Sequence, residues 1–355
     1  MRVLITGGTG FIGGALARYL LARGYSVVVF SRTVVNVSSL VELGAEAVHG
    51  DIRDAGALER ACAGCDAVVH TAGMPRPASW RTFRGVHIEG TKNVIAAAQR
   101  AGVRRVVHVA SQAVMFSGVD LPRMDESMPY PARYIDPYSA TKGEGERIAL
   151  AANGVGGVEV TSLRPAVVWG RGDTTVLPMM ARLARSPMGI PMCGDGSNLE
   201  ATTHIENLVE AITLALDAPG IGGRAYLVGD AFQISWKEFL GSLVEAAGVR
   251  ARFTRLPKAI AASGAWLLDS AGGAVGLPVP LARFGVWTSL TSRVIASTRA
   301  RDELGYTARV GLADGLADLR AWVAEVGGAK ALMKGASKRS EMQTARVRIR
   351  RAAAP

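Results

Sequence analysis

A glycine-rich turn close to the N-terminus constrains the fold of this 355-residue chain more than any other feature. Residues 6–13 read TGGTGFIG and lie between the apolar run RVLIT and the helically spaced stretch ALARYLLARG. Glycines at such a junction let the chain turn tightly, let a pyrophosphate approach the backbone, and let the helix pack against the strand. The free N–H groups at the start of the helix then bind phosphate. The turn therefore predicts a dinucleotide site at the start of a βαβ unit.

Further strand-like runs alternate with helical stretches through the first half of the chain. The runs are almost continuous in Val and Ile, as in YSVVVFSR, DAVVHTAG, RRVVHVAS and VEVTSLRP. Strands of this kind are buried on both faces, as in a parallel sheet that is covered by helices. We therefore predict an α/β fold with a doubly wound parallel sheet, a Rossmann fold, as the dinucleotide-binding domain over residues 1–175.

The composition of the sequence changes after Pro165. Glycine, proline and methionine become frequent, and the helical stretches HIENLVEAITLALDA and SWKEFLGSLVEAAG flank the strand-like AYLVGD. We predict a smaller, mixed α/β C-terminal portion over residues 176–328 that binds the substrate, with some of its strands returning to the first sheet. Residues 329–355 are predicted to form a basic, disordered tail.

The positive charge of the chain is concentrated in that tail. The chain has 41 Lys or Arg residues against 30 Asp or Glu residues, a formal net charge of +11, and eight of these basic residues follow position 329 with one acidic residue. A basic tail is most often a solvated segment, although it leaves peripheral contact with an anionic membrane open. Because no zinc finger, helix-turn-helix or aromatic RNA-binding motif accompanies it, we do not expect a nucleic-acid partner.

The N-terminus and the cysteines predict a cytoplasmic protein. The chain enters a strand at Arg2, which leaves no room for a cleavable signal. No uncharged apolar run reaches the roughly 18 residues that a membrane-spanning helix needs. Cys62, Cys65 and Cys193 fit a reducing compartment. The CxxC at 62–65 runs from a helix into a strand, so we interpret it as two small buried side chains, and we predict no metal site.

The end of the second strand predicts which dinucleotide binds. An NAD-binding chain usually has Asp or Glu there to hold the ribose 2′-hydroxyl, whereas a nearby Arg accommodates the 2′-phosphate of NADP. This strand ends Phe30-Ser31-Arg32, without an acid. We therefore expect NADP in preference to NAD, the alternative being that Arg32 is a solvated surface residue. Asp51 and Ile52, after the third strand, are placed to flank the adenine.

A tyrosine and a lysine stand four residues apart in DPYSATKGEGERIAL. On a helix this spacing places Tyr138 and Lys142 on one face, about 5 to 6 Å apart at Cβ. A phenol near its usual pKa is a poor base at neutral pH, and an adjacent cation favours the phenolate. The pair is therefore a candidate for general acid or base catalysis.

These motifs together resemble the extended short-chain dehydrogenase/reductase family, which is also the NAD-dependent epimerase/dehydratase family. TGGTGFIGG, GDIRD, DAVVHTAG, EGTKN, RRVVHVAS, Tyr138 with Lys142, and LRPAVVWGRGD follow the family's order and spacing, and the resemblance extends to about residue 325. The resemblance implies hydride transfer between the nicotinamide C4 and a carbinol carbon. It also implies a homodimer as a further expectation.

The resemblance also implies roles for individual residues. Tyr138 would be the general acid or base, Lys142 would lower its pKa and hold the nicotinamide ribose, and Ser111 would hydrogen-bond the reacting oxygen. The expected cofactor-binding residues are Gly7, Gly10, Phe11, Ile12, Gly13, Arg32, Asp51, Ile52, Thr71, Ala72, Tyr138, Lys142 and Pro165.

Two departures from the family bear on mechanism and substrate. The chain has His87 where many relatives have Asn, which predicts either a substitute polar relay or a hydrogen-bonded structural histidine. After the GDG turn at 194–196, Leu199 and Glu200 occupy positions where enzymes of nucleotide sugars carry arginines, and a Glu200 carboxylate is expected to repel a diphosphate. The sequence therefore argues against a sugar nucleotide.

The second half instead resembles the 3β-hydroxysteroid dehydrogenase/isomerase branch, through GSNLEATTHIENLVEAI, AYLVGD, SWKEFL and RARDELGY. We expect an NAD(P)-dependent oxidoreductase that interconverts a secondary alcohol and a ketone on a hydrophobic, sterol-like or long-chain substrate. The apolar segment from Leu256 to Trp287 either lines the pocket or forms an ordinary helical pair. A nucleotide-sugar epimerase or dehydratase and a nonenzymatic dinucleotide-sensing protein are the alternatives.

Overall fold

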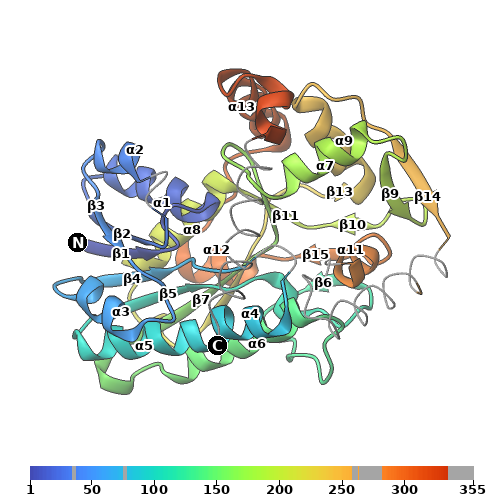
Figure 1. The fold of residues 1–355 in the computed structure, drawn as a ribbon. Coiled ribbons are helices and arrows are strands. Elements are labelled where there is room, and N and C mark those ends of the chain that lie inside the picture. The colour runs from blue at the N-terminus through green and yellow to red at the C-terminus, as the bar shows by residue number, and fades with distance from the viewer. Residues whose placement is uncertain (34–36, 75–77, 258–262, 264–281, 335–355) are drawn as a thin grey trace, which may run out of the picture.

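The computed structural model of the chain describes residues 1–33, 37–74, 78–257, 263 and 282–334. Within these residues, seven strands form one parallel sheet in the order β12-β7-β5-β4-β1-β2-β3 (Figure 1). The strands of this large sheet are β1 (Arg2–Thr6), β2 (Ser26–Ser31), β3 (Glu46–His49), β4 (Ala67–His70), β5 (Arg105–Val109), β7 (Glu159–Pro165) and β12 (Ala225–Val228).

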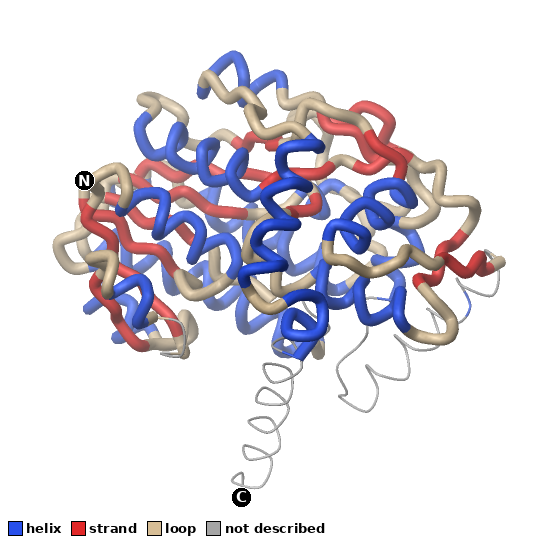
Figure 2. The backbone as a smooth tube through the Cα atoms, turned by 90° about the horizontal axis from the view of Figure 1, so that it is seen from above, coloured by secondary structure: helices blue, strands red, loops and turns tan. Residues whose placement is uncertain are grey.

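Helices cover both faces of the large sheet. In the view from above, the strands run beneath the helices that cover them (Figure 2). One face carries α1 (Phe11–Leu21), α8 (Ile205–Asp217) and α12 (Thr298–Leu304), and the other carries α3 (Ala55–Cys62), α5 (Gly90–Arg100) and α6 (Pro137–Ala151). The doubly wound α/β fold predicted from the sequence is thereby confirmed. The strand β12 and the helices α8 and α12 come from beyond residue 176, so the two portions of the chain are interleaved in space.

Continuous apolar strands explain why this sheet is buried on both sides. In β1, Val3 and Ile5 pack with α1 and α8, while Leu4 packs on the opposite face against α3 and α5. All three side chains are fully buried. Burying a side chain of this size contributes about 1.5 to 3 kcal/mol.

Smaller sheets make up the substrate-side region, which we define as the part of the fold built on β6, β8 to β11 and β13 to β15. The described strands form a four-stranded sheet, β13-β10-β15-β6, and the two-stranded pairs β11-β8 and β14-β9. Their bounds are β6 (Leu121–Met124), β8 (Val167–Trp169), β9 (Ile190–Cys193), β10 (Leu199–Glu200), β11 (Thr202–His204), β13 (Ile234–Ser235), β14 (Phe253–Leu256) and β15 (Arg293–Ile295).

Helices α7 (Val176–Arg185), α9 (Trp236–Ala246) and α13 (Leu312–Glu325) pack around a separate apolar cluster that includes Trp169 and Phe239. The remaining helical segments are α2 (Ser38–Val41), α4 (Trp80–Phe83), the π-helical η1 (Arg84–Glu89), the short η2 (Gln112–Met115) and η3 (Val155–Gly157), and α11 (Ala282–Thr288).

Three expectations about segments outside the large sheet can be compared with this fold. Cys62 and Cys65 are buried at the end of α3, as predicted. The predicted tail begins too early, because residues 328–334 are helical and Leu332 is buried against the α7, α9 and α13 cluster; residues 335–355 lie outside the described residues. Most of the apolar segment from Leu256 to Trp287 also lies outside them. Among the helices that are described, none is long and apolar enough to cross a membrane.

Candidate active site

The glycine-rich turn has the geometry that a dinucleotide requires. Gly7 has a φ of +71°, and a Cβ at this position would lie 2.8 Å from the Ala72 Cα. A Cβ on Gly13 would lie 2.5 Å from the Gly7 carbonyl oxygen, so α1 packs against the turn more closely than an alanine allows. Gly10 caps α1, whose first N–H groups therefore face the space beyond the turn. The turn is a cradle that fits a pyrophosphate.

The other predicted cofactor residues follow neighbouring strands at the same edge of the large sheet. Thr71 follows β4 and its hydroxyl donates to the Thr6 carbonyl oxygen at 2.7 Å, which ties this loop to the glycine turn. Phe11 opens α1 and borders Gly172 in the loop after β8. Pro165 ends β7. In an open parallel sheet, ligands bind beyond the carboxyl ends of the strands, and these residues lie there.

Two arginines surround the acid that follows β3. Arg53 donates to both carboxylate oxygens of Asp51, at 2.9 and 2.6 Å, and Arg32 Nη1 lies 3.9 Å from Asp51. Burial acts to raise the pKa of Asp51, yet the hydrogen bonds from Arg53 outweigh it and lower the pKa to about 2. The local charge at this end of the site is therefore positive, with Asp51 already engaged by Arg53.

The predicted catalytic residues come together where α6 crosses the end of β5. Asp136 caps α6 by accepting the Ser139 N–H at 2.9 Å, which fixes the first turn that carries Tyr138. Lys142 is buried one turn later and its ammonium donates to the Val109 carbonyl oxygen at 2.8 Å. Ser111 follows β5 and is hydrogen-bonded to the Tyr138 phenol.

Burial sets the protonation of these groups. It raises the pKa of Tyr138 to about 12, against the opposing hydrogen bond from Ser111. It lowers the pKa of Lys142 to about 8, against the opposing negative charge of Glu146. That Lys142 lowers the pKa of Tyr138 stays a prediction, since burial dominates that pKa here and the Lys142 ammonium donates to the Val109 carbonyl oxygen. At neutral pH the site therefore holds a neutral phenol beside an ammonium.

His87 has a structural place beside Tyr138. Its Nε2 accepts the Met74 backbone N–H at 3.0 Å, so Nδ1 carries the proton and donates to the Thr141 hydroxyl at 2.9 Å. The imidazole packs edge-on to the Tyr138 ring, with centroids 5.6 Å apart. The two ring nitrogens join η1 to the loop after β4 and to α6, which favours the structural interpretation over a relay.

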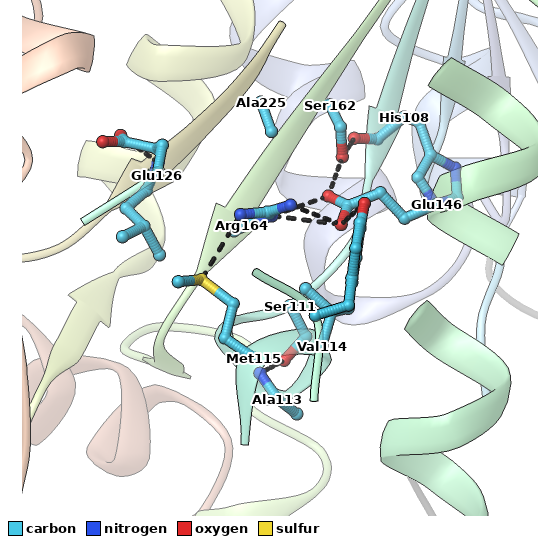
Figure 3. A network of polar contacts seen from close by, with 12 residues as sticks. His108, Ser111, Ala113, Val114, Met115, Glu126, Glu146, Ser162, Arg164 and Ala225 are labelled. Carbon is cyan, nitrogen blue, oxygen red and sulfur yellow. Dashed lines mark hydrogen bonds and ion pairs between the residues drawn. The ribbon is translucent and has the colours of Figure 1, made fainter. Parts of the chain in front are cut away.

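Two buried ion pairs near these residues escaped the sequence analysis. Glu146 on α6 binds Arg164 on β7 (Figure 3), and Glu200 on β10 binds Arg293 on β15. A signal for the first pair existed, since Arg164 interrupts an apolar strand and Glu146 lies four residues after Lys142.

Glu200 corrects an expectation about the substrate. Its carboxylate accepts Arg293 Nη2 at 2.7 Å and Gln112 Nε2 at 2.9 Å, and all three side chains are buried. Burial raises the pKa of Glu200 to about 7, despite the opposing charge of Arg293. The expectation that Glu200 repels a diphosphate is therefore wrong, because Arg293 and Gln112 bind its carboxylate inside the protein.

Comparisons with known proteins agree with this geometry. A sequence model of the NAD dependent epimerase/dehydratase family matches residues 3–229. The chain is 34% identical over 324 residues to the 4-hydroxy-2-methyl-3-oxo-4-farnesyl-3,4-dihydroquinoline-1-oxide ketoreductase of Stigmatella aurantiaca, a match that covers 90% of this chain and 96% of that protein. It is 33% identical over 338 residues to the 2-alkyl-3-oxoalkanoate reductase of Stenotrophomonas maltophilia, covering 90% of this chain and 99% of that protein.

Two further comparisons concern the 3β-hydroxysteroid dehydrogenase branch and the fold. The 3-beta-hydroxysteroid dehydrogenase of Mycolicibacterium neoaurum is 34% identical over 260 residues, which is 70% of each chain. Among solved structures, the dTDP-glucose 4,6-dehydratase DesIV of Streptomyces venezuelae with NAD bound superposes with a TM-score of 0.72 at 28% identity, covering 92% of this chain and 97% of that one.

Proposed function

Because the chain belongs to the NAD-dependent epimerase/dehydratase family, we propose that it is an NAD(P)-dependent oxidoreductase that interconverts a ketone and a secondary alcohol on a hydrophobic substrate. The observation that carries the proposal is the Tyr138 phenol, neutral at neutral pH, hydrogen-bonded to Ser111 at the carboxyl end of β5. A protonated phenol is ready to act as an acid, and reduction of a ketone requires a proton at the carbonyl oxygen.

The residues divide the reaction between them. The dinucleotide, when bound, supplies or accepts the hydride. Tyr138 gives its proton to the substrate oxygen during reduction and takes it back during oxidation. Ser111 hydrogen-bonds the same oxygen and fixes its distance from the phenol. Lys142 places a positive charge beneath the site, which stabilises the phenolate that Tyr138 becomes after the proton leaves.

The names of three relatives support the hydrophobic ketone. Two reductases matched over almost their whole length have an oxo group in the names of their substrates, and the third relative, matched over 70% of its length, is named for a hydroxysteroid. In this chain the buried Phe83 packs edge-on to Tyr138, with ring centroids 6.1 Å apart, so the phenol ring rests against an apolar side chain. Arg293 is bound by Glu200 rather than directed to a ligand phosphate.

The second candidate is nucleotide-sugar chemistry, which the likeness to the dTDP-glucose dehydratase favours. Two parallel reactions separate the candidates. The protein is incubated with NADPH or NADH and a 2-alkyl-3-oxoalkanoic acid or a 3-oxosteroid, and separately with NAD⁺ or NADP⁺ and a nucleotide sugar. Nicotinamide absorbance and the masses of the products are followed in both. Net oxidation of the cofactor with an apolar ketone supports the proposal. Conversion of the nucleotide sugar without net cofactor oxidation refutes it.

We propose further that NADP is preferred over NAD. The support is the positive charge next to Asp51. Arg32 and Arg53 both face the Asp51 carboxylate, and Arg53 already binds it. A 2′-phosphate would meet Arg32 there, with roughly the strength of a charge-assisted hydrogen bond. Replacing Arg32 by Ala is expected to weaken NADPH binding about tenfold and to leave NADH binding unchanged, since a hydrogen bond to a charged group contributes about 1.5 to 3 kcal/mol. Tighter binding of NADH than of NADPH by the unaltered protein would contradict this preference.

A further inference from the structure

The Glu146 carboxylate lies one helical turn beyond Lys142, on the same buried face of α6. Glu146 is 0% exposed and Lys142 is 7% exposed. Three side chains from other elements donate to the Glu146 carboxylate: Tyr130 at 2.8 Å, Ser162 at 2.6 Å, and Arg164 through Nε at 2.9 Å and Nη2 at 2.9 Å (Figure 3). The carboxylate is thus held in one orientation by groups on β7 and on the loop before α6.

These donors compensate the burial of the Glu146 carboxylate. A buried carboxylate without partners would take up a proton, because its charge is poorly solvated. The Arg164 guanidinium is permanently charged and meets the carboxylate in a forked geometry, which stabilises the anion. Arg164 is itself fixed, since Nη1 donates to the Met115 Sδ at 3.3 Å and the guanidinium lies over the Tyr130 ring.

The ammonium of Lys142 has few charged neighbours. The titratable and charged groups facing it are His70 on β4, His87 on η1, His108 on β5, Tyr138 and Glu146 on α6, and Arg164 on β7 behind Glu146. Burial lowers the pKa of each of the three histidines far below neutral pH, so they carry no charge. The Tyr138 phenol is neutral as well. Among the described residues, the negative charge acting on Lys142 is that of Glu146.

We propose that Glu146, held by Arg164, is a positioning residue that supplies the fixed negative charge keeping the buried Lys142 protonated. The inference rests on the proposed function and deepens it. A residue outside the reacting groups, Glu146, controls the charge of the Lys142 ammonium next to Tyr138.

The test measures the titration of Lys142 directly, so it does not depend on turnover. Lysines carrying ¹³C at Cε are titrated by NMR, and the Lys142 resonance is assigned as the one missing from Lys142→Met. In Glu146→Gln, Lys142 is expected to bind its proton at least about tenfold more weakly than in the unaltered protein, since an opposite charge at this range shifts a pKa by about 1 to 3 units. The matched control is Glu144→Gln on the same helix, which removes an exposed carboxylate and is expected to leave the titration unchanged.

Glu146→Asp supplies a result that a purely structural role would not give. It keeps the negative charge but shortens the side chain and so disturbs its contacts with Tyr130, Ser162 and Arg164, and Lys142 is expected to hold its proton as in the unaltered protein. If Glu146→Gln does not fold, Glu146→Met with Arg164→Met replaces the pair by apolar side chains, a change that buried pairs often tolerate. Lys142 is then expected to lose its proton at lower pH, because the nearer of the two charges is gone.

An unchanged Lys142 titration in Glu146→Gln, or in the double variant where that is measured, overturns the inference whatever the reaction proves to be. If the titration moves as expected and no ketone is reduced, the proposed function fails while the inference stands. Where the protein is active, the loss of kcat at high pH is expected to move to lower pH in Glu146→Gln and to stay at the same pH in Glu146→Asp.

Discussion

The part of the large parallel sheet around β1 and the substrate-side region are stabilised by different forces. In β1 the side chains of residues 3–5 are fully buried and apolar, and the ion pair of Arg2 with Glu46 lies on the exposed rim. The buried ion pair of this sheet described above lies elsewhere, where α6 packs on β7. In the substrate-side region, β10 is two residues long and its Glu200 forms a fully buried pair with Arg293.

This difference shows what each region depends on. The part of the large sheet around β1 gains its free energy from area removed from water, which any apolar side chain of suitable size supplies. The four-stranded sheet depends on a matched set of buried polar groups, in which each member leaves the others unsatisfied if it is lost. The substrate-side region is therefore more sensitive than the part around β1 to single substitutions of its charged residues.

The largest expected effect comes from breaking the Glu200 pair. Replacing Glu200 by Leu leaves Arg293 buried without its carboxylate and is expected to lower the free energy of unfolding by about 3 to 5 kcal/mol. The double variant Glu200→Leu with Arg293→Met is expected to lie within about 1 kcal/mol of the unaltered protein, or above it. Denaturant unfolding measures both. A double variant as unstable as the single one would break the comparison between the regions.

A pH dependence of opposite sign is expected from one carboxylate in each region. Burial raises the pKa of Glu200 from 4.5 to about 7. Between these two pH values the native state therefore binds more protons than the unfolded state. The stability that Glu200 contributes is therefore complete below about pH 4.5 and is lost as the pH rises through about 7, on the order of 3 kcal/mol in all. Measuring unfolding of the unaltered protein and of Glu200→Gln across this range isolates the difference.

Glu159, at the start of β7, provides the contrast. Burial acts to raise its pKa, but hydrogen bonds and charge from Arg105 outweigh burial and lower it. Its contribution to stability is present above pH 4.5 and is lost as the pH falls, so the difference between the unaltered protein and Glu159→Gln changes in the opposite direction. Equal signs for the two carboxylates would contradict the assignment of Glu200 as buried and Glu159 as solvated.

Helix caps are expected to have equal effects in the two regions, because a cap is a local contact. Asp54 caps α3 by accepting the Ala57 N–H at 3.1 Å, and Ser235 caps α9 in a capping box with Glu238. Replacing either cap by Ala is expected to cost about 1 kcal/mol. Thermal unfolding of Asp54→Ala and Ser235→Ala compares them. A clear inequality would indicate that one helix is coupled to its surroundings more strongly than its cap geometry suggests.

The smallest effect is expected at the rim of the large sheet. The Arg2 and Glu46 side chains are 33% and 54% exposed, and solvent screens their attraction. Arg2→Ala is expected to cost about 0.2 to 1 kcal/mol, less at high salt. A loss comparable to that of Glu200→Leu would mean that burial does not govern the strength of ion pairs in this fold.

The two regions also differ in how well their sequences predicted them. The strands of the large sheet, the glycine turn and the spacing of Tyr138 and Lys142 were found from local patterns, because apolar runs and fixed spacings are properties of neighbouring residues. Ser111 came from the resemblance to the family. The Glu200 contacts join residues 88 and 93 positions apart, and strands of two or three residues carry no periodicity. Glu200 was therefore interpreted as an exposed charge, although the fold makes it part of a buried pair.

Transfer of isotope from the cofactor tests the central claim most directly. The protein is given NADPH carrying deuterium at C4 of the nicotinamide, in each of the two stereochemical positions, with an apolar ketone of the class named above. Mass spectrometry is expected to find deuterium at the carbinol carbon of the product from one of the two forms. In Tyr138→Phe, product formation is expected to fall by about 10² to 10⁴-fold, because the proton donor is gone, while NADPH still binds. Absence of deuterium from the product, or full turnover by Tyr138→Phe, would contradict the assignment of Tyr138 as the acid in a hydride-transfer reaction.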